Sequence, residues 1–247
     1  MEIIAALLAG SFIGAVLGFI GAGGAMLTVP ILIYIFNFTP HHATTASLAV
    51  VFLAASSGVA AKIRSNEVLY RDALVIWSIG LVTNLGFSSV SDQFSEKFIT
   101  TGFAIVLIAA GISSLRPPLS EIHKRMPLRS LIFFALLIGS VTGIFGIGGG
   151  FLAIPVLVLF FGTPVNVAAG TSMLIISLNS LTAFFGHYRM WSVVDWHIPT
   201  AIAITAVIVA NLASRAGAFA KPVVMRRAFA ALLLTVSLFT LLQTWFG

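Results

Sequence analysis

The sequence predicts an all-α, multi-pass membrane protein made of two inverted repeats of about five helical segments each. Three observations support this class. Hydrophobic residues make up 59% of the 247 positions and charged residues only 8%. Apolar segments alternate with short polar stretches along the whole chain, and one glycine-rich motif occurs twice, 125 residues apart. A soluble domain has about 25% charged residues, so this chain could not cover itself with polar surface in water.

The apolar segments of the first repeat (residues 1–115) and of the second repeat (130–247) match in number and order. A helix needs about 20 apolar residues to cross a bilayer. The second segment of each repeat is too short, because it reaches roughly 17–20 Å against about 30 Å of hydrocarbon. We therefore expect both short helices to start deep in the protein. The predicted segments are 2–20, 26–38, 43–61, 72–91, 98–115, 130–146, 151–161, 167–186, 198–219 and 228–246.

A glycine-rich break precedes each short segment, and the two breaks correspond position by position. Irregular backbone inside a membrane persists only where protein or water satisfies it, and matched breaks in two halves indicate a transporter's substrate site. Glycines let backbone N–H groups approach an anion, and the helix dipole that follows favours negative charge. Close helix packing is the alternative interpretation. The candidate substrate-binding glycines are Gly21, Gly23 and Gly24 in the first break and Gly146, Gly148, Gly149 and Gly150 in the second.

Hydroxyl and amide side chains follow in the third segment of each repeat. The segment of the first repeat begins with Thr45 and Ser47, and that of the second begins with Gly170, Thr171 and Ser172. These hydroxyls can donate to an oxyanion, although capping of the helix start explains at least one of each pair. Asn179 lies two turns after Ser172 and is added to the candidate substrate-binding residues, with interhelical hydrogen bonding as the alternative.

Charge placement predicts the topology. If all ten segments cross, then eleven of the thirteen Lys and Arg residues fall in 62–71, in the linker 116–129 and in 215–227. The positive-inside rule assigns these regions to the cytoplasm, which makes the halves inverted and places both termini outside the cytoplasmic membrane. This placement also disfavours a nucleic-acid partner, while the lipid bilayer is an expected one and a homo-oligomer stays open.

Absent residue types narrow the chemistry. No cysteine is present, so disulfides and cysteine-based metal sites are excluded. The seven acidic residues all fall in loops or at segment ends, which disfavours a carboxylate-relayed cation transporter. No metal, cofactor or catalytic residue is predicted. A small anionic substrate would then be held by backbone amides, hydroxyls and helix dipoles.

The repeated Gly-x-Gly-Gly…Pro element, followed by a Gly-Thr-Ser-like helix start, resembles the TauE/SafE family, the sulfite exporter family. The likeness covers nearly the whole chain, and the second half matches it more closely than the first, where Thr45-Ala46-Ser47 stands in place of Gly-Thr-Ser. The resemblance implies export of small sulfur-containing anions such as sulfite or organosulfonates.

The expected function is therefore a secondary transporter or exporter of such anions rather than an enzyme. An anion channel or facilitator fits the same pattern, and the sequence does not fix the anion or the coupling ion. A remote alternative is an intramembrane serine protease with Ser172 as nucleophile. Its histidine base would be His187 or His197, and His187 lies about 22 Å further along the same helix.

Overall fold

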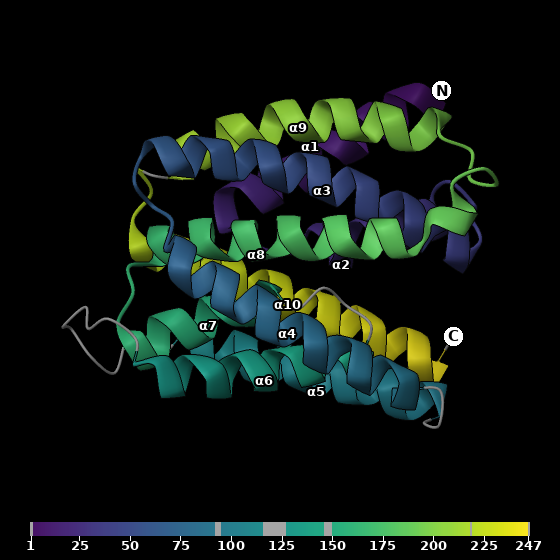
Figure 1. Cartoon of the computed structure of the whole chain (residues 1–247). Coiled ribbons are helices and arrows are strands. Elements are labelled where there is room, and N and C mark those ends of the chain that lie inside the picture. The colour runs from purple at the N-terminus through teal and green to yellow at the C-terminus, as the bar shows by residue number, and fades with distance from the viewer. Residues whose placement is uncertain (1, 92–94, 116–126, 146–149, 218, 247) are drawn as a thin grey trace.

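The computed structural model describes residues 2–91, 95–115, 127–145, 150–217 and 219–246. Within these ranges the chain forms ten α-helices and one short 3-10 helix and contains no strand, which confirms the all-α prediction (Figure 1). The helices are α1 (Glu2–Ile20), α2 (Gly24–Tyr34), α3 (Pro40–Arg64), α4 (Tyr70–Ser91), α5 (Glu96–Leu115), α6 (Leu128–Phe145), α7 (Gly150–Phe161), α8 (Val165–Gly186), α9 (His197–Gly217) and α10 (Pro222–Phe246), with η1 (Tyr188–Met190) after α8.

The helices run side by side, so the bundle has two ends. Figure 1 shows both chain termini on the right, together with the α8–α9 connection, and we call this the terminus end. The opposite end holds the α3–α4 connection, the last residues of α5 and α9 and the first residues of α6 and α10, and is called the linker end. By the charge pattern, the linker end is the one predicted to face the cytoplasm.

The second helix of each repeat is short, as expected. Helix α2 has 11 residues and α7 has 12. Two glycines with positive φ, Gly21 (83°) and Gly23 (92°), turn the chain between α1 and α2, a conformation that glycine adopts without steric cost. Helix α2 begins inside the bundle, because a Cβ on Gly24 would lie 3.0 Å from Val51, midway along α3.

Helices α1 and α9 pack along a seam of small residues. Gly10, Gly14 and Gly18 recur every four residues on one face of α1. A Cβ on Gly14 would lie 2.6 Å from the carbonyl oxygen of Ala206, and one on Gly18 would lie 2.8 Å from the Cα of Ala210. Such spacing lets two helix backbones approach closely inside a membrane. Helix α1 of the first half is thus held by α9 of the second half.

A helix of the second half likewise packs against a helix of the first half. Helix α6 packs against α4, with Gly139 close to Gly80 and to the hydroxyl of Thr83. The central helices α3 and α8 run antiparallel and are joined by a 2.8 Å hydrogen bond between Ser56 and Ser177. These pairs are the ones expected of two related halves of opposite orientation. The inverted repeat and the domain boundaries themselves stay predictions.

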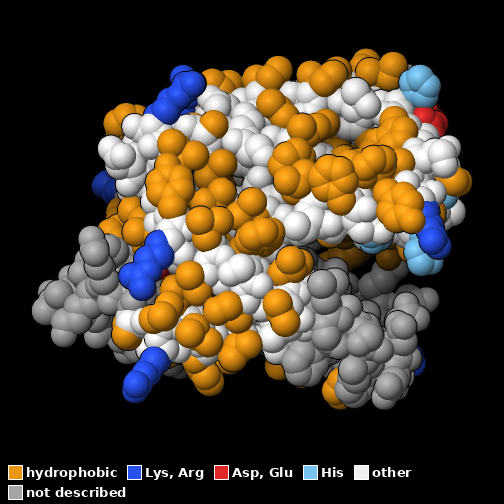
Figure 2. Space-filling view, in the orientation of Figure 1, with side chains coloured by type: hydrophobic (Ala, Val, Ile, Leu, Met, Phe, Trp, Pro, Cys, Tyr) orange, Lys and Arg blue, Asp and Glu red, His pale blue; other side chains and the backbone are white. Residues whose placement is uncertain are grey.

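The outer surface fits a lipid environment. Six described helices, α1, α3, α5, α8, α9 and α10, are long and apolar enough to cross a membrane. Figure 2 shows apolar side chains over the middle of the face formed by α9, α3 and α8, with Lys, Arg and His side chains towards its two ends. A band of apolar surface between charged ends is the pattern of a multi-pass membrane protein.

Candidate functional site

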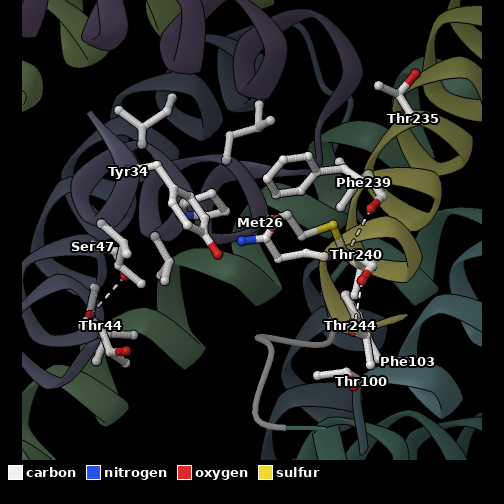
Figure 3. Close-up of a pocket in the computed structure, with 18 of the residues that line it drawn as sticks. Met26, Tyr34, Thr44, Ser47, Thr100, Phe103, Thr235, Phe239, Thr240 and Thr244 are labelled. Carbon is white, nitrogen blue, oxygen red and sulfur yellow. Dashed lines mark hydrogen bonds between the residues drawn. The ribbon is translucent and has the colours of Figure 1, made fainter. Parts of the chain in front are cut away.

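A cavity of about 940 Å³ extends from the terminus end into the bundle, between α2 and α10. Figure 3 shows Tyr34 of α2 and Thr44 and Ser47 of α3 on one side of it, and Phe239 and Thr240 of α10 on the other. Pockets of this size hold small ligands. The walls come from both halves of the chain, because α1 to α5 and α8 and α10 all contribute residues.

Most of the cavity wall is apolar. Met26 lies at the start of α2, and Phe103 of α5 contributes an aromatic face. The remaining apolar lining residues are Phe12, Leu27, Val29, Pro30, Ile31, Ile33, Leu48, Ala183, Val236 and Phe239. An apolar wall with a few polar groups is the usual composition of a small-molecule site, since the polar groups then fix orientation and selectivity.

The hydroxyl groups of the cavity are largely engaged with their own helices. Thr44 donates to the carbonyl oxygen of Pro40 at 2.8 Å, and Ser47 donates to that of Thr44 at 2.8 Å. Thr240 and Thr244 donate in the same way to the carbonyls four residues earlier, at 2.8 and 2.7 Å. A bound anion would have to draw these protons away from the helix carbonyls.

The side-chain amides are better placed as donors. Asn84 of α4, Asn179 of α8 and Gln243 of α10 line the cavity, and among the described residues these side chains form no hydrogen bond. Lys97 of α5 is the cation of the described lining, and its ammonium lies 5.7 Å from the ring centre of Trp245. No carboxylate belongs to the described lining. The cavity therefore offers donors and positive charge but no negative charge.

The predicted glycines of the first break lie beside this cavity rather than in its wall. Gly21, Gly23 and Gly24 are all buried. The Gly21 N–H donates to the carbonyl oxygen of Leu17 at 2.8 Å, and a Cβ there would lie 2.6 Å from Ala169 of α8. Their packing places the N-terminal turn of α2, with its favourable dipole end, next to the cavity at Met26.

The structure describes only one of the four candidate glycines of the second break. Gly146, Gly148 and Gly149 lie outside the described residues. Gly150 is the first residue of α7. Whether these glycines contact a ligand stays a prediction.

The two threonines that begin the third helix of each repeat tie that helix to the other half. Thr45 of α3 is completely buried and donates to the carbonyl oxygen of His41 at 2.9 Å. Its hydroxyl oxygen also lies 3.0 Å from Nδ1 of His187, after the end of α8. Since the Thr45 proton is used, Nδ1 of His187 is the donor in this second bond. Burial, and secondly the nearby His41, lower the pKa of His187.

Thr171 does the same at the linker end. Its hydroxyl donates to the carbonyl oxygen of Val167 at 2.7 Å and accepts the backbone N–H of Leu69 at 3.0 Å. Gly170 lies directly under this connection, because a Cβ there would collide with the carbonyl oxygen of Glu67. The Gly-Thr pair thus holds the α3–α4 connection against α8 in this structure.

The remaining candidates separate into two groups. Ser47 and Asn179 both line the large cavity, one from each half of the chain. Ser172 is completely buried and is not part of the described cavity wall, although it lies two turns from Asn179. The structure therefore brings Ser47 and Asn179 together around one space and places Thr45, Gly170 and Thr171 in contacts between helices.

A buried ion pair at the linker end was not found from the sequence. Lys62, the third-last residue of α3, is only 1% exposed, and its Nζ lies 2.7 Å from Oε2 of Glu67. The other carboxylate oxygen accepts the side-chain N–H of Asn166, from the start of α8, at 2.5 Å. The sequence indication of this pair is two opposite charges five residues apart across a Ser-Asn turn. The topology prediction places Lys62 in a cytoplasmic region instead of inside the bundle, so it does not reveal the pair.

These features define a multi-pass helical membrane protein with a central cavity suited to a small solute. The model of the "Sulfite exporter TauE/SafE" family matches residues 6–240. The chain belongs to this family, and the family defines it as a membrane transporter.

Proteins similar to this chain carry the same general description. A "Probable membrane transporter protein" of Xylella fastidiosa (strain 9a5c) is 26% identical over 246 residues, which cover 96% of this chain and 94% of that protein. The "Probable membrane transporter protein YunE" of Bacillus subtilis (strain 168) is 28% identical over 215 residues, which cover 76% and 78% of the two chains. No solved structure matches this chain significantly.

Proposed function

We propose that this transporter exports small sulfur-containing anions, such as sulfite or an organosulfonate, across the cytoplasmic membrane with both termini outside. The observation that carries the proposal is the composition of the large cavity. Asn84, Asn179 and Gln243 contribute amide donors, Lys97 contributes a positive charge, and the described lining contains no acidic residue. Such a site attracts an anion, because it offers donors and a positive charge and has no negative charge that would repel the anion.

The small number of hydrogen-bond donors suits a substrate that must be released on the other side of the membrane. In the membrane interior, a fixed Lys or Arg beside the anion would bind it strongly. Lys97 instead lies on an exposed part of α5, near its first residue. A negative cytoplasm favours exit of a monovalent anion by about 2.3 kcal/mol per 100 mV. The membrane potential alone can therefore drive export.

An anion channel is the second candidate. A cavity that opens at one end fits both a carrier and a closed channel. The two differ in flux, because a carrier saturates and exchanges its substrate across the membrane, whereas an open pore conducts without counterflow. The protease alternative gains no support, because Ser172 is completely buried and His187 is bonded to Thr45.

The test is anion flux in proteoliposomes with sulfite, sulfate, thiosulfate and sulfoacetate, at imposed voltages. We expect saturable, voltage-dependent flux of at least one of these anions in the wild type. Replacing Asn179 by Leu keeps the side-chain size and removes a hydrogen bond to a charged group, which contributes about 1.5–3 kcal/mol. The half-saturation concentration should rise about tenfold or more.

The matched control is Thr182→Val on the same helix. Thr182 donates to the carbonyls of its own helix and is not part of the described cavity wall, so this variant should transport normally. Loss of flux in both variants, or in neither, would place the anion site elsewhere. Absence of flux for all four anions would refute the substrate class.

A further inference from the structure

A second, much smaller cavity lies at the linker end. It has a volume of about 10 Å³ and lies where α7 meets α5 and α10. Pro155 and Val158 of α7, Ser114 of α5, and Arg226 and Phe229 of α10 are among its lining residues. It is smaller and more enclosed than the large cavity between α2 and α10.

The walls of the two cavities correspond between the repeats. Each pair consists of one residue that lines the large cavity and one that lines the small cavity, at a separation of 125 or 126 positions. The pairs on the short helices are Pro30 with Pro155 and Ile33 with Val158, and those on the fifth helices are Phe103 with Phe229, Thr240 with Ser114 and Thr100 with Arg226.

The helices around these two cavities are packed differently. Around the small cavity, Pro155 and Val158 of α7 lie so close to Ser114 of α5 and Phe229 of α10 that a space of only about 10 Å³ is left. Around the large cavity, α2 and α10 enclose open space and touch near its mouth, where the rings of Tyr34 and Phe239 lie 5.9 Å apart. Equivalent residues thus form an open site at one end and a closed site at the other.

We infer that the small cavity is a second anion site, which opens to the linker end when the large cavity closes. This inference rests on the proposed function. Its ligand is the same class of small oxyanion, recognised by the guanidinium of Arg226 and the hydroxyl of Ser114. Arg226 occupies the position that Thr100 has in the large cavity. Each described lining thus contains one basic residue, but Lys97 of the large cavity is exposed, whereas Arg226 is half-buried in the wall of the small one. A guanidinium binds an oxyanion through two parallel hydrogen bonds, which suits capture from a dilute cytoplasmic pool.

Single cysteines test the opening without any assumption about the substrate. The chain has no cysteine of its own, so an introduced one is the sole target of a membrane-impermeant maleimide. Val158→Cys lies in the wall of the small cavity. Leu157→Cys is the control, since Leu157 is also buried on the same helix but lies outside that wall. Labelling is compared in inside-out and right-side-out membrane vesicles.

We expect Val158→Cys to react at least tenfold faster than Leu157→Cys, and only from the linker end. Ile33→Cys, its partner in the large cavity, should react from the terminus end. Equal, slow reaction of the two α7 variants from both sides would overturn the inference, because the small cavity would then be static packing. This result does not depend on which anion is carried, so it is distinct from failure of the proposed function.

The charge is tested by substituting Arg226. Arg226→Gln should raise the half-saturation concentration of a transported anion about tenfold when it is added at the linker end and leave it unchanged at the terminus end. Arg226→Lys should restore part of the affinity. The neighbour Arg227→Gln is the control, because Arg227 is exposed and does not line the cavity. An equal effect at both ends, or equal effects of the two glutamine variants, would exclude a linker-end anion site at Arg226.

Discussion

Removing the carboxylate of Glu67 should destabilise the fold strongly. The ammonium of Lys62 is 1% exposed and its Nζ lies 2.7 Å from the carboxylate, so Glu67→Ala leaves a buried positive charge without its ion-pair partner. Breaking a buried pair by removing one partner costs about 3–5 kcal/mol. The amide of Asn166 also loses its acceptor, which places the expected loss towards the upper part of this range.

The measurement is the free energy of unfolding in mixed detergent micelles, followed by circular dichroism as the fraction of SDS is raised. The double variant Lys62→Met with Glu67→Ala removes both charges and keeps most of the volume at Lys62. We expect it to be more stable than Glu67→Ala alone, since replacing a buried ion pair with apolar groups is often neutral. The cycle of single and double variants isolates the coupling between the two side chains.

Two results would refute this reasoning. A loss below about 1 kcal/mol for Glu67→Ala would mean that the pair behaves like an exposed surface salt bridge. Additive losses in the double variant would mean that the two side chains do not stabilise each other. Either result would show that water reaches Lys62 at the linker end.

Three further predictions concern packing and pH. Gly14→Ala should cost about 1–3 kcal/mol of stability by overpacking, because the new Cβ meets backbone atoms of α9, whereas Gly186→Ala, with nothing within 4 Å, should cost little in the same assay. Thr171→Val should cost about 1 kcal/mol, because a part-buried backbone N–H loses its acceptor. A loss as small as that of Gly186→Ala would contradict this. Because the pKa of His187 is lowered from its ordinary value of 6.5, the unfolded chain binds the proton more readily, and this residue reduces stability as the pH falls below that value. Thermal denaturation at pH 7.5 and 5.5 should show a smaller pH effect in His187→Gln than in the wild type.

The helices could be predicted because their signals are local. Apolar runs and glycine breaks place the ten α-helices found in the described ranges, and the structure shifts most boundaries by only a few residues. Helices α3 and α10 start earlier than the apolar segments do, at Pro40 and Pro222. Proline is favoured in the first turn of a helix, where its missing N–H has no partner in any case. The apolar criterion cannot detect a polar first turn.

The contacts of the candidate site could not be predicted in the same way. The Thr45 hydroxyl meets a histidine 142 residues away, and Thr171 accepts an N–H from a residue 102 positions earlier. No local sequence pattern identifies either partner, because each contact depends on how α3 and α8 pack side by side. The cavity wall has the same origin, since Asn84 and Asn179 come together only when helices of both halves assemble.

The positions of the two threonines show that the repeated motif has a packing role beside the open cavity. Thr45 contacts the connection that follows α8, and Thr171 contacts the connection that follows α3. The first turns of each central helix are therefore bonded to the segment that follows the other central helix. Ser47, two residues after Thr45, lines the open cavity, whereas its counterpart Ser172 is not part of a described cavity wall. The Thr45 contact is made at the end where the cavity is open, so the equivalent contact of Thr171 should persist when the linker-end cavity opens as we infer. Substitutions at Gly170 and Thr171 should therefore lower the stability of both states rather than change the balance between them.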